Sequence, residues 1–233
     1  MNRIASCSIF SAMLLIFAAC GTGTRSDGNE HETDTGTMTA KTDSLRDDCP
    51  AIVAFGDSLT KGEGVSSSLN YPAKLQERLD REGYDYCVIN KGISGETSAQ
   101  GLNRVADIIS IKPEIAIVEF GANDGLRGIP VESMARNLGE IVRRLRAAGI
   151  EVILAGMEVP PNYGPEYTRS FREVFRNISE SNGIPLIPFF LDGVGGHPEL
   201  NQEDGIHPTA EGYDIVVDNV WKILEPMLQS GRN

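Results

Sequence analysis

The chain has 233 residues, of which 40% are hydrophobic and 23% charged, a size and composition that fit one globular domain rather than two. Its 33 acidic and 21 basic side chains give a formal net charge of −12, so we expect no nucleic-acid partner, which would need a broad positive surface. The one long apolar run lies in the first twenty residues, which excludes a protein that spans a membrane several times.

The first 20 residues are typical of an export signal. A basic start at Arg3 precedes an apolar stretch from Ile9 to Ala19, which is shorter than the roughly 20 residues needed to span a bilayer. The sequence Phe17-Ala18-Ala19-Cys20-Gly21 resembles a bacterial lipobox, whose cysteine receives lipid and becomes the new N-terminus. We therefore expect a signal peptide with a lipobox over residues 1–20. The alternative is ordinary cleavage near Ala19, which would release a soluble secreted protein.

Residues 21–48 are rich in Thr, Ser, Gly, Asp and Glu and contain almost no side chains that could be buried. Such a composition cannot offset the conformational entropy that folding removes. The sequence therefore predicts a disordered acidic tether over 21–48, followed by one folded domain over 49–233.

Two cysteines, Cys49 and Cys87, remain in the predicted domain. Each lies near the start of a predicted strand, and if those strands are parallel neighbours their first residues lie about 5 Å apart, within the range of a disulfide. An exported protein meets an oxidising compartment, which favours such a bond. Two interpretations stay open at this point, a disulfide and a pair of buried free thiols.

Short apolar runs alternate with stretches of helical periodicity from residue 49 onward, which predicts a parallel sheet covered by helices. Strands are expected at Ala51–Phe55, Cys87–Asn90, Ile115–Phe120, Val152–Gly156 and Pro185–Phe189. Helices are expected at Tyr71–Glu82, Ala99–Ile109, Val131–Ala148, Pro165–Ser181 and Thr209–Leu228. The fold class is therefore α/β, a three-layer α/β/α sandwich with a five-stranded parallel sheet of flavodoxin-like order. Its functional groups should lie after the carboxyl ends of the strands.

A serine follows the first predicted strand, in the sequence Gly56-Asp57-Ser58-Leu59. Taken alone, Ser58 is more simply a turn or helix-capping residue. A serine nucleophile needs a base within hydrogen-bond reach and an acid that fixes the tautomer of that base. The loop before the last predicted helix holds both groups, Asp204 and His207.

His207 is the best candidate for the base by elimination. Of the other two histidines, His31 lies in the tether and His197 has no acid at a comparable spacing. A structural or helix-capping histidine is the simpler alternative for His207. We expect no metal site, because no third and fourth ligand follow at a characteristic spacing.

Two further loops, after the second and third predicted strands, contain Gly95 and Asn123. A glycine amide and an asparagine carboxamide can donate hydrogen bonds to the negative oxygen of a tetrahedral intermediate. Each is more simply a turn residue when considered singly. Their common position beyond strand ends is what indicates a site.

Taken together, these segments resemble the four sequence blocks of the GDSL, or SGNH, hydrolase family, in the proper order. The blocks are Gly56-Asp57-Ser58-Leu59, Gly95, Gly121-Ala122-Asn123-Asp124 and Asp204-Gly205-Ile206-His207. The resemblance extends from about Ala51 to Leu228 and is nearest to bacterial thioesterases of the arylesterase and lysophospholipase type. Ala122 differs from the glycine that this subgroup commonly has there.

The resemblance implies a role for each of these residues. Ser58 would be the nucleophile, His207 the general base and then acid, and Asp204 the partner that orients the imidazole. The backbone N–H groups of Ser58 and Gly95 and the side chain of Asn123 would form the oxyanion hole. No cofactor is required.

The implied reaction is hydrolysis of an acyl ester through an acyl-enzyme, with a lysophospholipid, an aryl ester or an acyl thioester as substrate. Apolar residues near the site could line an acyl groove or could be buried loop contacts: Leu126, Ile129, Pro130, Met157 and Pro160. A carbohydrate O-acetyl esterase and a catalytically inactive surface binding module are the alternatives. We expect a monomer that meets the membrane only through a lipid anchor and faces the periplasm or the cell surface.

The lipid anchor has a direct test. We expect the Cys20→Ser change to move the protein from the membrane fraction to the soluble extract, because the thiol that accepts lipid is gone. Immunoblotting of the two fractions measures this shift, and a variant that stays with the membrane would contradict lipid attachment at Cys20.

Overall fold

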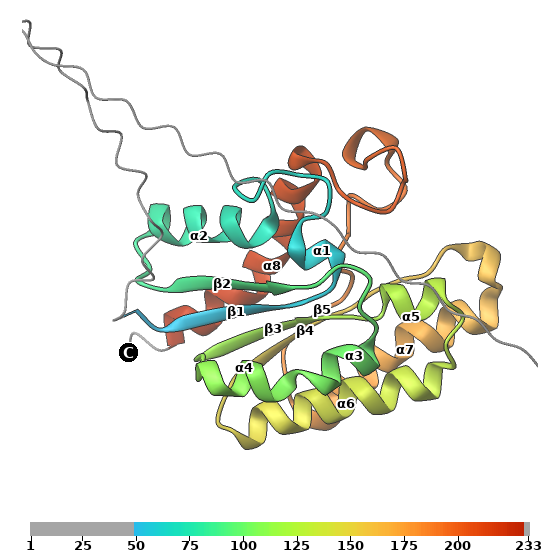
Figure 1. Cartoon of the computed structure of the whole chain (residues 1–233), viewed down its shortest axis with the longest axis horizontal. Helices are drawn as coiled ribbons and strands as arrows, with labels where there is room; N and C mark the ends of the chain where they lie inside the picture. The colour runs from blue at the N-terminus through green and yellow to red at the C-terminus, as the bar shows by residue number, and fades with distance from the viewer. Residues whose placement is uncertain (1–48, 231–233) are drawn as a thin grey trace, which may run out of the picture. The chain divides into compact units, whose positions relative to one another are not determined.

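The computed structural model describes residues 49–230 of the chain (Figure 1). The predicted signal peptide, Cys20 and the predicted tether lie outside these residues. Within the described part, no helix is both long enough and apolar enough to cross a bilayer.

Five parallel strands form a single sheet with the order β2-β1-β3-β4-β5, and this confirms the predicted flavodoxin-like arrangement. The strands are β1 (Ala51–Gly56), β2 (Cys87–Gly92), β3 (Ile115–Glu119), β4 (Glu151–Ala155) and β5 (Leu186–Ile187). All five residues of β3 are buried, as are the last five of β1. Central strands covered on both faces are expected to be apolar throughout, which is why their positions were legible in the sequence.

Helices cover both faces of the sheet and complete the three layers (Figure 1). The helices α2 (Tyr71–Glu82) and α8 (Ala210–Ser230) pack together on one face. The other face carries α3 (Ser98–Asn103), α4 (Val105–Ile111), α6 (Val131–Ala147) and α7 (Pro165–Asn182). Two short helices follow strand ends, α1 (Ser58–Lys61) after β1 and α5 (Ala122–Leu126) after β3.

The helix predicted over Ala99–Ile109 is wrong in one respect, because the structure has two helices that are separated at Arg104. The guanidinium of Arg104 donates hydrogen bonds to the Glu96 carboxylate at 2.6 Å and to the carbonyl oxygen of Gly56 at 3.0 Å. It also lies 4.5 Å from the centre of the Phe55 ring. These contacts hold the junction between the two helices against the end of β1. The helical spacing of buried residues continues through this junction, so the sequence pattern does not reveal it.

The last strand is also shorter than predicted. Only Leu186 and Ile187 pair with β4, although the apolar run extends from Pro185 to Phe189. Pro188 has no backbone N–H and cannot continue the ladder. Beyond it the chain turns, and the N–H of Phe190 donates to the carbonyl oxygen of Gly156 at 2.8 Å.

Cys49 and Cys87 are joined by a disulfide. Cys87 begins β2 and pairs in register with Ala51, which leaves the two cysteine Cα atoms 5.8 Å apart. The bond closes a loop of 38 residues, and the loss of loop entropy in the unfolded chain corresponds to about 4 kcal/mol of stabilisation. It secures the amino ends of the two strands, at the opposite edge of the sheet from Ser58.

Candidate active site

The candidate nucleophile lies where β1 ends and α1 begins. Asp57 caps α1, because its Oδ1 accepts the backbone N–H of Leu59 at 3.0 Å. Ser58 is the first residue of the helix and lines a cavity above the strand ends. A Cβ at Gly56 would lie 2.1 Å from the Thr60 hydroxyl and 2.5 Å from a carboxylate oxygen of Glu119. Only glycine therefore fits at this turn.

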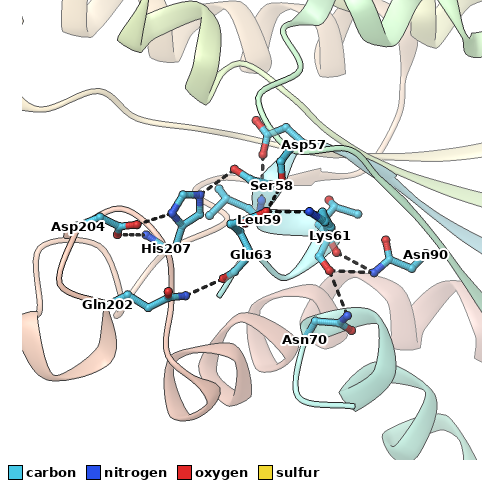
Figure 2. A network of polar contacts seen from close by, with 12 residues as sticks. Asp57, Ser58, Leu59, Lys61, Glu63, Asn70, Asn90, Gln202, Asp204 and His207 are labelled. Atoms are coloured by element: carbon cyan, nitrogen blue, oxygen red, sulfur yellow. Dashed lines mark hydrogen bonds and ion pairs between the residues drawn. The ribbon is translucent and has the colours of Figure 1, made fainter. Parts of the chain in front are cut away.

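The structure brings together Ser58, His207 and Asp204 (Figure 2). The Nε2 atom of His207 lies 2.8 Å from Ser58 Oγ, and its Nδ1 atom lies 2.7 Å from Asp204 Oδ2. Both residues of this pair come from the loop before α8, which returns to the edge of the sheet where β1 ends. His197 is elsewhere on the surface, 3.5 Å from Glu199, and His31 lies outside the described residues.

Asp204 is held in its ionised form. Although partial burial would raise its pKa, hydrogen bonds from the His207 ring and from the backbone N–H groups of Ile206 and His207 outweigh this and lower the pKa to about 2. A carboxylate at this position accepts the Nδ1 proton of His207. Nε2 is then left as the acceptor that faces Ser58 Oγ, which is the tautomer a general base requires.

Three potential donors to an oxyanion meet at the same cavity, namely Ser58, Gly95 and Asn123. The backbone N–H groups of Ser58 and Gly95 have no partner among the described residues. Asn123 uses one N–H of its carboxamide on Asp57 Oδ2, at 3.0 Å. The second N–H of that group remains available to a ligand.

The loops that carry Gly95 and Asn123 are tied to each other. The Asp124 carboxylate accepts the backbone N–H of Ser98 at 2.8 Å and its hydroxyl at 2.6 Å. Arg127 donates to the carbonyl oxygen of Gly95 at 2.6 Å, and Gly95 itself has a φ of +78°, where glycine is favoured. The oxyanion donors are therefore placed by interactions between loops that follow different strands.

Two buried carboxyl groups lie behind the nucleophile. Burial raises the pKa of Asp57 to about 6, although hydrogen bonds from Leu59 and Asn123 act in the opposite direction. Burial, with the neighbouring Asp57 charge, raises the pKa of Glu119 well above its ordinary value. Sequence reasoning did not single out Glu119. Its one signal was an acidic residue at the end of an otherwise apolar strand.

The cavity in front of Ser58 has a volume of about 530 Å³, within the range of small-molecule sites. Of the residues predicted for an acyl groove, it is lined by Leu126, Met157 and Pro160. Ile129 and Pro130 are not in the lining, so the prediction was wrong for these two residues. The chain turns away at Gly128, where φ is +61°, and Pro130 already caps α6.

Four more apolar residues complete the walls. Val159 lies between the predicted residues Met157 and Pro160, and Ile206 lies in the fourth sequence block. Phe189 and Leu191 come from a segment that sequence reasoning did not assign to the site. The segment 189–206 has no strand and only one short 3-10 turn, so its path over the sheet follows from packing rather than from any periodic pattern. Within the described residues, no group of three or more His, Cys, Asp or Glu side chains is placed to hold a metal ion.

The fold and the site are those of a serine hydrolase, and comparison with known proteins specifies the family. The chain belongs to the GDSL-like lipase/acylhydrolase family, which it matches over residues 54–215. The esterase TesA of Pseudomonas aeruginosa is 42% identical over 178 residues, or 76% of this chain and 89% of that protein.

Two more relatives point to the same chemistry. Thioesterase 1/protease 1/lysophospholipase L1 of Escherichia coli strain K12 is 34% identical over 76% of this chain and 84% of that protein. The second is the crystal structure of the psychrotrophic esterase EstA from Pseudoalteromonas sp., inhibited by monoethylphosphonate. The match with it covers 77% of this chain and 98% of the EstA chain. Its TM-score is 0.73 at 34% identity. The protein is therefore an ester-hydrolysing serine hydrolase.

The raised pKa of Asp57 predicts that its ionised carboxyl lowers the free energy of unfolding, whereas its protonated form does not. Its carboxyl is uncharged in the folded protein until the pH approaches 6, whereas in the unfolded chain it ionises near pH 4, at about 3.9. The stability it contributes is present at low pH and is lost as the pH rises through about 6. We expect Asp57→Asn to be at least as stable as the wild type at high pH, with an advantage that shrinks below pH 6.

The same variant should lose activity, because Leu59 and Asn123 donate to different oxygens of Asp57, and the amide nitrogen that replaces one of these oxygens cannot accept a hydrogen bond. We expect turnover to fall about tenfold or more. Urea unfolding between pH 4 and 8 and ester kinetics measure the two effects. A turnover within about twofold of the wild type would contradict the role assigned to Asp57.

Proposed function

We propose that the protein is an exported esterase that cleaves acyl esters and thioesters through an acyl-enzyme on Ser58. The observation that supports this best is the unbroken hydrogen-bonded series from Asp204 to His207 to Ser58 at the apolar cavity, with distances of 2.7 and 2.8 Å. A hydroxyl in contact with an oriented neutral imidazole is the arrangement that activates a serine.

The proposed reaction has two halves. Ser58 Oγ attacks the acyl carbonyl carbon while Nε2 of His207 takes the hydroxyl proton, and the carbonyl oxygen becomes negative. The N–H groups of Ser58, Gly95 and Asn123 would stabilise that charge. Cleavage of the bond between the acyl carbon and the leaving oxygen or sulfur releases the alcohol or thiol, which receives the proton from His207. Water then attacks the acyl-enzyme by the same route and releases the acid.

An acyl chain is the substrate part that best suits the cavity. Its apolar walls are built by Leu126, Met157, Val159, Pro160, Phe189, Leu191 and Ile206. An acetyl group would use little of a space of about 530 Å³, and burial of each further methylene is worth about 0.8 kcal/mol. The names of the relatives, esterase and thioesterase/lysophospholipase, agree with a fatty acyl ester or thioester.

We further propose that the protein is exported, carries lipid on Cys20 and faces the periplasm or the cell surface. The Cys49–Cys87 disulfide supports an oxidising compartment. All groups of the proposed site come from one chain, which supports action as a monomer.

A panel of p-nitrophenyl esters tests the acyl assignment. We expect kcat/KM to rise about tenfold or more from the acetate to the octanoate, because the longer chain is buried in the cavity. Ser58→Ala should lower turnover by about 10⁴ or more on every ester. The Leu126→Ala change should reduce the rate on octanoate more than on acetate.

The matched control is Leu69→Ala, since Leu69 is exposed to a similar extent, 40% against 46% for Leu126, but is not in the lining. That change should leave the chain-length profile unaltered. Rapid turnover of acetyl esters with none on octanoate would contradict the acyl cavity and favour an O-acetyl esterase. Wild-type activity in the Ser58→Ala variant would contradict the mechanism itself.

A further inference from the structure

Glu119 is a buried acid for which the reaction above has no use. It ends β3, and its side chain is wholly buried behind the nucleophile turn. Its Oε2 accepts the Thr60 hydroxyl at 2.8 Å and the backbone N–H of Asp57 at 3.3 Å. Its Oε1 has no hydrogen-bond partner within the described residues.

The surroundings of Glu119 do not suit a negative charge. Its titratable neighbours are the Asp57 carboxyl before α1, whose charge raises the pKa of Glu119, and the hydroxyls of Tyr71 on α2 and Tyr213 on α8, whose own pKa values are raised by a charge on Glu119. In the part of the chain that the structure describes, no lysine, arginine or histidine forms an ion pair with it. Burial of an unpaired carboxylate is costly, and burial and the Asp57 charge raise the pKa of Glu119 well above its ordinary value. Both effects favour the protonated, uncharged form of this carboxyl.

A short series of contacts leads from this carboxyl to the oxyanion hole. Glu119 holds the backbone of Asp57 through the N–H of that residue. The Asp57 carboxyl in turn accepts an N–H of Asn123 at 3.0 Å, and Asn123, which lines the cavity, keeps its other N–H for a ligand. An Asn carboxamide can be turned either way, and an acceptor at this place fixes its nitrogen rather than its oxygen toward Asp57.

We propose that Glu119 is a positioning residue for the oxyanion hole, whose accepting carboxyl oxygen holds the Asp57 turn in the position that aims Asn123 at the reacting carbonyl. This rests on the oxyanion role proposed above for Asn123. Glu119 acts through Asp57 and touches no substrate, so its loss affects the chemical step rather than substrate binding.

A double-mutant cycle between Glu119 and Asn123 tests the proposal, with p-nitrophenyl butyrate as substrate at pH 8. The Glu119→Leu change removes both oxygens at similar volume, and we expect kcat to fall about 10- to 100-fold with KM within about threefold. Asn123→Ala alone should lower kcat about 10²–10³-fold. In the Asn123→Ala background, Glu119→Leu should lower kcat by less than about threefold, because the group it positions is already absent.

Two further variants separate positioning from mere packing. Glu119→Gln keeps an accepting oxygen without a charge and should retain at least about a third of the wild-type kcat from pH 7 to 9. Glu114→Leu makes the same exchange at the exposed residue just before β3 and should leave kcat unchanged. If Glu119→Leu does not fold, Thr60→Val takes its place in the cycle, because it removes the hydroxyl donor to Glu119. It should lower kcat several-fold only where Asn123 is present.

Equal losses from Glu119→Leu in both backgrounds would overturn the proposal, as would a wild-type kcat in that variant. A Glu119→Gln variant as impaired as Glu119→Leu would also overturn it, because an accepting oxygen at this position would then not be enough to hold the Asp57 turn. If Asn123→Ala leaves kcat unchanged, the proposed oxyanion hole fails first and the role of Glu119 fails with it. The Asn123→Ala variant therefore shows whether the oxyanion hole itself or only the role of Glu119 has failed.

Discussion

A hydrogen bond of 2.8 Å between Ser58 and His207 joins two segments that lie 149 residues apart in the chain, and the remaining parts of the site are placed around it. In a parallel sheet all strands end at the same edge, so the turn after β1, the loops after β2 and β3 and the loop before α8 converge there. The disulfide lies at the opposite edge, between the amino ends of β1 and β2. The architecture thus separates the rigid covalent link from the loops that hold the reacting groups.

Three carboxyl groups near this edge differ in pKa because their surroundings differ. Asp204 is only partly buried and accepts several N–H donors, which lower its pKa to about 2 and keep it ionised beside His207. Asp57 and Glu119 are buried behind the nucleophile, where burial raises the pKa of each. One acid therefore stabilises the imidazole, while the buried pair holds the backbone and the Asn123 carboxamide. A difference in environment, rather than in residue type, assigns these roles.

Much of this arrangement was predictable from the sequence, and the exceptions have physical reasons. The strands and most helices were legible because buried parallel strands and amphipathic helices leave periodic apolar patterns. The break at Arg104 was not, since it depends on contacts with Glu96 and Gly56 that no local pattern encodes. The four sequence blocks indicated the groups of the catalytic triad and the oxyanion hole. They did not indicate Glu119, because a single acid in an apolar strand forms no motif. The part of the cavity wall built by Phe189 and Leu191 follows from loop packing alone.

The most direct test of the account is the rate and site of reaction with a fluorophosphonate, which reports whether His207 activates Ser58 in the folded protein. The account predicts a single labelled peptide that contains Ser58, identified by mass spectrometry. It also predicts a second-order rate constant that falls about 100-fold or more in a His207→Gln variant of unchanged thermal stability. Labelling at another residue, or an equal rate in the two proteins, would contradict the claim that this contact is what makes the serine a nucleophile.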